Sequence, residues 1–204
     1  MFLSMTSVID KPKDAVVNSL ANYSKLAGGG LEREVLPVEA NNCCVIEEAN
    51  GNTTIFNPYA YLEWDASSEF ISRHLNAPVF SFHIHDGDLW MYILFVNGVI
   101  VDQFNPLPDY WDDNISGEEI ESWKGNAVII SKYVSSIKPA DIENYLVRWD
   151  LDAEENNKAY AGDEFAQEDW QLLDFMKKLG LPYPLNADGT AKGETYKLWT
   201  KELP

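Results

Sequence analysis

The stretch PVFSFHIHDGDLWMYILFVNGVIVDQFNPLPDY, residues Pro78–Tyr110, decides the fold of this chain. Runs of β-branched and aromatic residues alternate in it with short clusters of turn residues. Asn97-Gly98 favours a two-residue hairpin turn, and a second turn of Asp and Gly residues falls at 86–88. The stretch therefore predicts three consecutive antiparallel strands, at 78–85, 89–96 and 99–104.

Alternation within the first of these strands predicts two different faces, because side chains two residues apart point the same way. One face carries Phe80, Phe82 and Ile84, and the other carries Ser81, His83 and His85. The residues expected to be buried are Phe80, Phe82, Ile84, Ile93 and Phe95. The second face offers two imidazoles side by side, which makes it a candidate site.

Periodicity in the rest of the chain predicts an α+β fold. An antiparallel meander sheet of about five to six strands is expected mainly within residues 31–104, with helices packed on it mainly at 13–27, 66–76 and 116–179. Strands outside the opening stretch are expected at 31–39, 43–49 and 53–57, with a short one at 196–200. The chain reads as one domain, 1–204, with a helical sub-domain from about 115 to 204 as the alternative.

Helix boundaries follow from capping and stop signals. Asp65 or Ser67 is expected to cap the helix at 66–76, whose apolar stripe comprises Phe70, Ile71, His74 and Leu75. Within 116–179, the segments expected to be helical are 118–123, 126–134, 139–149 and 164–179. Pro139 suits a first helical turn, and Gly180 is expected to end the last helix.

The charge of the chain limits its partners. Its 33 acidic and 15 basic residues give a net charge of −18, although 46% of the residues are hydrophobic and seven are Trp. Such a chain repels nucleic acid and anionic membranes at long range. A basic partner protein is therefore the expected class of partner, and the alternative is an acidic surface that serves only solubility.

Cysteine usage and the chain start indicate the cytoplasm. Cys43 and Cys44 are neighbours in a predicted strand, so they point to opposite faces and a disulfide between them is not expected. One should face the core and the other should face outward. The first residues lack the basic and apolar regions of a signal peptide, and no stretch reaches the roughly 20 apolar residues of a membrane span.

The pair His83 and His85, followed by Asp86, is the first candidate site. Two imidazoles on one strand face and a carboxylate can bind Zn²⁺ with an open position, which would suit a small hydrolase. The set is incomplete, because the only other histidine is His74, and the turn residues also satisfy a hairpin without any chemistry. We therefore expect no metal and no cofactor, and the metal-dependent enzyme remains the alternative.

The second candidate site is the aromatic and acidic loop Tyr110, Trp111, Asp112 and Asp113. Aromatic side chains beside carboxylates can bind a basic protein. The alternative is that Trp111, like Trp123, fills the interface between sheet and helices. An exposed aromatic patch would favour the binding protein, and a buried pocket of carboxylate and histidine would favour the enzyme.

One block of residues resembles uncharacterised bacterial proteins. It comprises His85-Asp86-Gly87-Asp88-Leu89-Trp90-Met91-Tyr92, Asn97-Gly98, Asp102, Phe104-Asn105 and Pro108-Asp109-Tyr110, together with Asp163-Glu164-Phe165 and Leu179-Gly180. The resemblance covers about half the chain and implies a bacterial cytosolic protein, without an activity or a catalytic residue. The acidic, Trp-rich composition is also similar to that of bacterial toxin-immunity proteins. The leading hypothesis is thus a non-enzymatic protein-binding module with an immunity-like or regulatory role.

Overall fold

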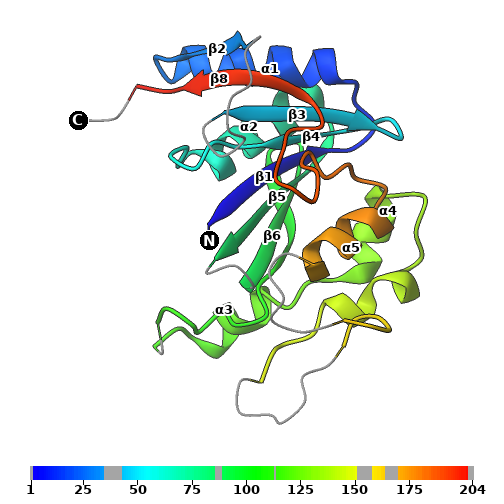
Figure 1. Cartoon of the computed structure of the whole chain (residues 1–204). Helices are drawn as coiled ribbons and strands as arrows, with labels where there is room; N and C mark the ends of the chain where they lie inside the picture. The colour runs from blue at the N-terminus through cyan, green and yellow to red at the C-terminus, as the bar shows by residue number, and fades with distance from the viewer. Residues whose placement is uncertain are drawn as a thin grey trace.

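The computed structural model describes residues 2–34, 43–85, 89–112, 114–150, 158–163 and 170–201. One antiparallel sheet runs through these residues, with helices on both of its faces (Figure 1). The strands are β1 (Leu3–Val8), β2 (Gly30–Arg33), β3 (Cys44–Ala49), β4 (Asn52–Phe56), β5 (Pro78–His85), β6 (Leu89–Val96), β7 (Val99–Phe104) and β8 (Glu194–Trp199). The helices are α1 (Lys13–Leu26), α2 (Trp64–Leu75), α3 (Gly117–Ser122), α4 (Ala127–Tyr133) and α5 (Trp170–Lys178), with 3-10 helices at Pro139–Asp141 and Glu143–Tyr145. The predicted α+β class is confirmed.

The sheet is larger than predicted because strands from both ends of the chain join it. Its eight strands lie in the order β2-β8-β3-β4-β1-β5-β6-β7, and every neighbouring pair is antiparallel. β1 lies between β4 and β5, while β8 lies between β2 and β3. β1 therefore joins β3 and β4 to β5, β6 and β7, while β8 joins the edge strand β2 to β3.

The three strands of the opening stretch have the predicted bounds. Phe80, Phe82 and Ile84 are all fully buried on one face of β5, whereas Ile93 on β6 is only half-buried. Asn97 and Gly98 both have a positive φ, 54° and 74°, as a tight hairpin turn of this kind requires. The predicted turn at 86–88 lies outside the described residues.

β1 is a strand that the sequence analysis did not predict. All six of its residues are buried, because helices cover both faces of the sheet there. Its polar residues find partners inside the protein: Oγ1 of Thr6 lies 2.8 Å from Oγ of Ser68, and Oγ of Ser7 lies 2.8 Å from Oγ1 of Thr54. Leu3 to Thr6 alternate between apolar and polar residues, but the pattern is only four residues long before Ser7 and Val8 break it.

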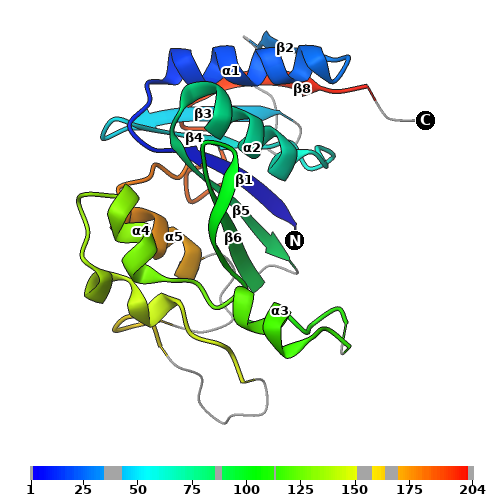
Figure 2. The ribbon, with the colours of Figure 1, turned by 180° about the vertical axis from the view of Figure 1, so that it is seen from behind.

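Two hydrophobic clusters fill the space between the sheet and the helices. One lies on the face covered by α4 and α5 and includes Cys43, and the other lies on the face covered by α1 and α2 and includes Cys44 (Figures 1 and 2). The two cysteines point to opposite faces, as expected, but both are fully buried. The expectation that one faces outward is wrong, because each cysteine side chain lies within one of the two hydrophobic clusters.

The expected caps of α2 are also wrong. The helix begins after Glu63, which makes no side-chain capping hydrogen bond. Ser67 donates instead to the carbonyl of Trp64, and Asp65 accepts from Ser81 on β5. Of the expected apolar stripe, Ile71 is buried, Phe70 and Leu75 are half-buried, and His74 is exposed, with its Nδ1 2.9 Å from Oγ of Ser19.

The C-terminal half differs from prediction in one segment. α3, α4 and β8 lie where they were expected, and α5 ends before Gly180, whose φ is 71°. The helix expected at 139–149 is wrong: this segment forms two 3-10 helices. Ile142 and Tyr145 are buried there at a spacing of three, which matches the repeat of a 3-10 helix. The expected helix start at 164–169 lies outside the described residues.

Candidate functional site

His83 and His85 lie on the face of β5 that α1 and α2 cover, opposite Phe82 and Ile84, as the alternation predicts. In the sheet, His83 lies across from Ser4 on β1 and from Met91 on β6. Figure 2 shows that the ends of β1 and β5 near the N-terminus extend beyond α2. Both imidazoles are consequently only partly covered.

Aromatic rings surround the two histidines. His83 contacts Trp64, the first residue of α2, with ring centroids 5.8 Å apart, and Phe2, at 6.2 Å. His85 contacts Trp111 at 5.0 Å and Tyr110 at 6.2 Å. The two candidate sites, separate in the sequence, are therefore neighbours in the structure.

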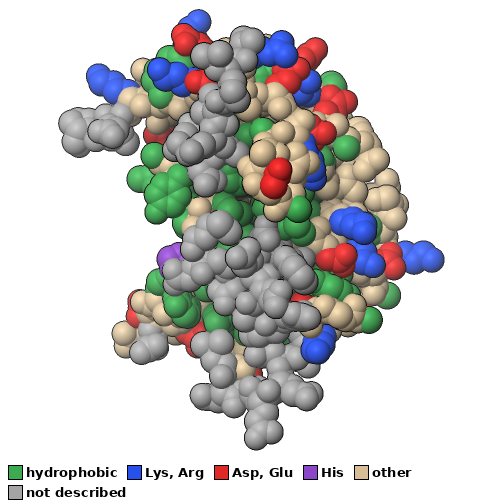
Figure 3. All heavy atoms as spheres, in the orientation of Figure 1, with side chains coloured by type: hydrophobic (Ala, Val, Ile, Leu, Met, Phe, Trp, Pro, Cys, Tyr) green, Lys and Arg blue, Asp and Glu red, His purple; other side chains and the backbone are tan. Residues whose placement is uncertain are grey.

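We call this row of rings the aromatic belt; its members are Phe2, Trp64, His83, His85, Tyr110 and Trp111. Figure 3 shows a histidine at one edge of the molecule with hydrophobic side chains on either side of it. The rings of Tyr110 and Trp111 also pack edge to face, 5.2 Å apart. The belt joins a strand, a helix start and a loop into one surface.

The loop end of the belt is open to solvent. Tyr110 is 48% exposed and Trp111 is 52% exposed, so Trp111 does not fill the interface between sheet and helices. The exposed carboxylate of Asp112 accepts hydrogen bonds from the backbone N–H and the side chain of Asn114, and these lower its pKa. Asp113 lies outside the described residues.

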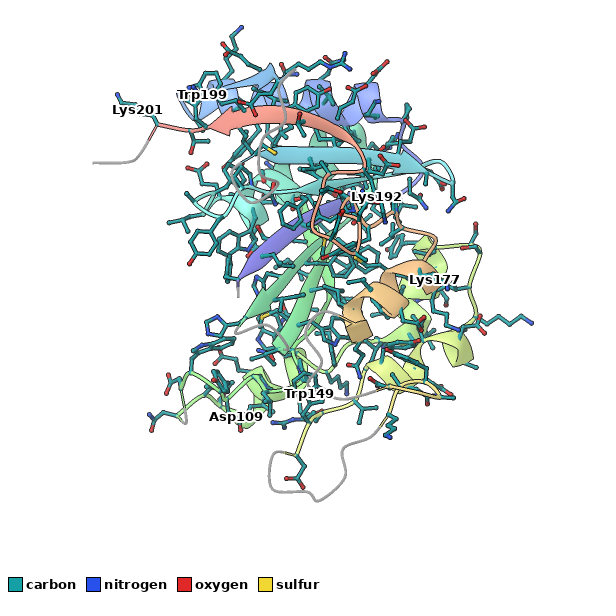
Figure 4. The ribbon with its side chains drawn as sticks, viewed as in Figure 1. Asp109, Trp149, Lys177, Lys192, Trp199 and Lys201 are labelled. Carbon is teal, nitrogen blue, oxygen red and sulfur yellow. The ribbon has the colours of Figure 1, made fainter. Side chains whose placement is uncertain are left out.

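Contacts at its base hold this loop in place. The backbone N–H of Trp149 donates to the carbonyl of Pro106, and Arg148 pairs with Asp109 at 3.5 Å. Figure 4 shows Asp109 and Trp149 at the same end of the molecule. Tyr110 and Trp111 are thus presented by an anchored loop, which favours binding because less conformational freedom is lost.

Acidic side chains follow the loop along the chain. Those of α3 are Glu118, Glu119 and Glu121, and all three are exposed. Glu121 pairs with Lys124 at 3.4 Å, and this exposed pair contributes little to stability. The surroundings of the loop are therefore anionic, in keeping with the net charge of −18.

His83 differs chemically from an ordinary surface histidine. Burial lowers its pKa to about 4, and the charge of His85 adds to that effect. At neutral pH its ring is therefore uncharged. Its Nδ1 is buried and has no hydrogen-bond partner within the described residues.

The metal hypothesis gains no further ligand from the structure. Among the described residues, no group of three or more His, Cys, Asp or Glu side chains could hold a metal ion. Asp86, the expected third ligand, lies outside those residues. Within the described residues, His83 and His85 therefore form a pair of candidate ligands without a third.

Two buried polar atoms at β1 were not predicted. Oδ1 of Asn57 and Nδ1 of His83 have no hydrogen-bond partner in the described part of the chain. Asn57 bonds to Ser4 on β1, and His83 lies across from the same residue. Placing Asn57 near His83 therefore requires β1, the strand that the sequence analysis did not recognise.

Two further findings concern the helices of this chain and its similarity to known proteins. None of the helices in the described ranges has both the length and the apolar composition needed to cross a membrane. Comparison of the chain with protein-family models, with curated proteins and with solved structures found no match in any of the three.

Proposed function

We propose that this protein is a non-enzymatic binding module of the cytoplasm that binds a basic partner protein through Tyr110, Trp111, Asp112 and Asp113. A regulatory or immunity-like role follows from such binding. The observation that carries the proposal is the exposure of Trp111, 52%, on a loop anchored to the rest of the fold. An exposed tryptophan beside carboxylates is typical of an interface residue that dominates affinity.

The short-range affinity comes from the aromatic rings. Burial of a tryptophan removes about 200 Å² from water, so covering the exposed half of Trp111 contributes about 2.5 kcal/mol at 25 cal/mol per Å². A lysine or arginine of the partner placed over the ring adds a cation–π interaction of about 0.5 to 2 kcal/mol. Trp111 alone would then change the dissociation constant by roughly two orders of magnitude.

The acidic side chains contribute mainly to the rate of association. Asp112 remains ionised well below neutral pH because Asn114 holds its pKa down. Together with the glutamates of α3 it attracts a basic partner over several ångström, and salt screens that attraction. We therefore expect the association rate to fall steeply as salt is raised from about 0.1 M to about 1 M.

The test requires a partner obtained by co-purification and then measured as a pure protein by surface-based binding kinetics. Trp111→Ala should raise the dissociation rate while the protein stays folded. Trp199→Ala is the matched control, since Trp199 is also exposed, 38%, and lies at the other end of the molecule (Figure 4). An unchanged dissociation rate for Trp111→Ala, or an equal change for Trp199→Ala, would contradict the proposal.

A charge-matched pair of variants tests the acidic contribution separately. Asp112→Asn removes a fully exposed carboxylate held by Asn114, and Asp188→Asn removes one held in the same way by Thr190 in another loop. Both variants change the net charge equally. Only Asp112→Asn should slow association, and equal slowing by both would show that the total charge, not this loop, attracts the partner.

The enzyme alternative is supported by one observation, the uncharged imidazole of His83 at neutral pH, which suits a base or a metal ligand. A small hydrolase would use His83, His85 and Asp86. Elemental analysis after dialysis tests it. About one zinc per chain, lost when His83 and His85 are both replaced by Ala, would favour this alternative over the binding module.

A further inference from the structure

Two Asn-Gly pairs, Asn50-Gly51 and Asn97-Gly98, form the turns of two hairpins, and the sequence has no other pair of this kind. The first joins β3 to β4, and the second joins β6 to β7. Their φ angles are 56° and 79° in the first pair, and 54° and 74° in the second. Both asparagines are exposed. The two turns thus have the same residues and nearly the same φ angles, and they differ in what surrounds them.

An Asn-Gly pair can react with itself, because glycine has no side chain to keep its backbone nitrogen away from the asparagine. The glycine nitrogen attacks Cγ of the asparagine, its proton passes through water to the side-chain amide nitrogen, and ammonia leaves. Water then opens the resulting five-membered imide at either of its two carbonyls. The product is aspartate or isoaspartate, and isoaspartate has one more carbon atom in the backbone. Water is the co-reactant, and nothing is oxidised or reduced.

The second of the two turns is held against α2. The N–H of Gly98, which is the group that would attack, donates to Oγ of Ser72 at 3.2 Å. Ser72 is buried and donates in turn to the carbonyl of Ala77 at 2.8 Å, so this acceptor is itself fixed. A Cβ added to Gly98 would lie 2.8 Å from Nε of Arg73, which shows how closely that side chain approaches.

The first turn is open by comparison. A Cβ added to Gly51 would meet nothing within 4 Å in the described part of the chain. Among the described residues, no acceptor outside the hairpin binds the N–H of Gly51. Nδ2 of Asn50 donates to the carbonyl of Gly180 at 3.4 Å, a long hydrogen bond that leaves the backbone of Gly51 unrestrained.

These contacts should make the two pairs react at different rates. Closure of the imide requires the turn to leave its native conformation, since the glycine nitrogen must come within bonding distance of Cγ. At Asn50 this opening disturbs the hairpin and the long hydrogen bond to Gly180. At Asn97 it also breaks the bond to Ser72 and displaces Gly98 from its place beside Arg73. A hydrogen bond of ordinary strength lowers the population of such an opened state about fivefold to tenfold.

We infer that Asn50 is a site of spontaneous deamidation in the folded protein, and that contact with α2 protects Asn97 from the same reaction. The product places a carboxylate opposite the carbonyl of Gly180, in place of the amide donor of Asn50. Nδ2 of Asn52 donates to the same carbonyl at 3.0 Å, so this bond alone would then join the hairpin to Gly180. The inference is independent of the proposed partner, because it involves neither the aromatic belt nor Asp112.

Peptide mapping by mass spectrometry, during incubation of the protein in mildly alkaline buffer, measures the conversion at each asparagine separately. The same chain unfolded in guanidinium chloride is the reference, and there both pairs should convert at similar rates because glycine follows each asparagine. In the folded protein, Asn50 should convert about tenfold faster than Asn97. Chromatographic separation of the aspartate and isoaspartate peptides checks that the reaction passes through the imide, since only the imide gives both.

Two variants of α2 test the protection directly, with Asn50 of the same molecule as the internal control. Ser72→Ala removes the acceptor of the Gly98 N–H, and Arg73→Ala removes the side chain beside Gly98. Each should raise the conversion rate at Asn97 about fivefold and leave the rate at Asn50 unchanged. The side chain of Arg73 is 63% exposed, so Arg73→Ala decides the test even where the buried change Ser72→Ala prevents folding. Circular dichroism shows whether each variant is folded.

Three results would overturn the inference. The first is that Asn97 converts as fast as Asn50 in the folded protein, which means that contact with α2 gives no protection. The second is that Asn50 stays unchanged while the unfolded chain converts, which means that the hairpin alone prevents the reaction. The third is that folded Arg73→Ala leaves the rate at Asn97 as low as in the natural chain.

Discussion

The uncharged His83 should make the stability of this protein depend on pH in a characteristic way. Its pKa is about 4 in the fold, against 6.5 for an ordinary histidine, because burial penalises the charged ring. The unfolded chain therefore binds a proton more readily than the folded chain between these two values. The stability that His83 contributes is fully present above pH 6.5 and is lost as the pH falls towards 4.

The magnitude follows from the same two pKa values. At about 1.4 kcal/mol for each pH unit, the loss amounts to about 3 kcal/mol as an upper value, since solvent still reaches part of the ring. For a chain of 204 residues, this corresponds to a melting temperature lower by about 6 to 12 °C. Thermal unfolding followed by circular dichroism at a series of pH values measures it.

The comparison with His83→Phe isolates this effect from other titrations. Burial raises the pKa of Asp65 and of Asp102, so protonation of these carboxyl groups stabilises the folded protein as the pH falls. The natural chain and the His83→Phe variant both contain these two groups, so their contribution cancels in the comparison. The melting temperature of the variant should therefore fall less than that of the natural chain between pH 6.5 and 4. His85→Phe should keep most of the difference, because burial is the larger cause of the shift. Parallel curves for the natural chain and His83→Phe would refute the reasoning.

Three further predictions concern the fold. Met5→Ala should lower the free energy of unfolding by about 2 to 5 kcal/mol in a denaturant titration, because Met5 is fully buried on the unpredicted strand β1; a loss below about 1 kcal/mol would contradict its central place. Gly98→Ala should cost about 1 kcal/mol or more in the same titration, since φ is 74° and the added Cβ would lie 2.8 Å from Nε of Arg73; an unchanged midpoint would contradict that turn. Cys43 and Cys44 should react with a thiol reagent only as fast as the protein unfolds, because both are buried and burial raises the pKa of each thiol; rapid reaction in buffer would show an open face.

Local signals were sufficient for the strands and turns of the opening stretch. In β5, large apolar side chains alternate with smaller or polar ones, and Asn97-Gly98 has a conformation that few other residue pairs adopt. The bounds of α1 also follow from periodicity. These elements depend on their own residues more than on distant parts of the chain, so a single sequence contains the information.

Long-range partners decided what could not be predicted. β1 has the sequence LSMTSV, in which serine and threonine are buried only because α2 and β4 supply hydroxyl partners from at least 47 residues away. The burial of Cys44 likewise requires α1, which packs against β3. The segment 139–149 was expected to be helical, yet Tyr145 donates to Asp174 of α5 and the chain there forms 3-10 turns. None of these partners is visible from local periodicity.

The same contrast between local signals and long-range partners explains why the candidate sites were predicted only in part. Tyr110, Trp111 and Asp112 were chosen for their residue types in a loop, and their exposure agrees with that choice. The contact of Trp111 with His85 was not predictable, since it depends on where the loop after β7 returns to the sheet. The position of Asn57 near His83 carried no signal in the sequence, because both residues are brought together by Ser4 on β1.

The lengths of α2 and β5 explain why a histidine pair stands at the boundary between covered and open surface. A helix of 12 residues spans about 18 Å, whereas a strand of eight residues spans about 26 Å. α2 ends and β5 begins at the tight turn Asn76-Ala77, so the two elements run side by side from that turn. The length of α2 therefore covers only about the first five or six residues of β5. That point is His83, where the structure places Trp64 against the imidazole. Beyond it none of the described helices covers the strand face, and the belt residues Phe2 and Trp111 cover it only in part. The same mismatch in length therefore produces the half-covered imidazole of His83 and the partly exposed aromatic belt next to it.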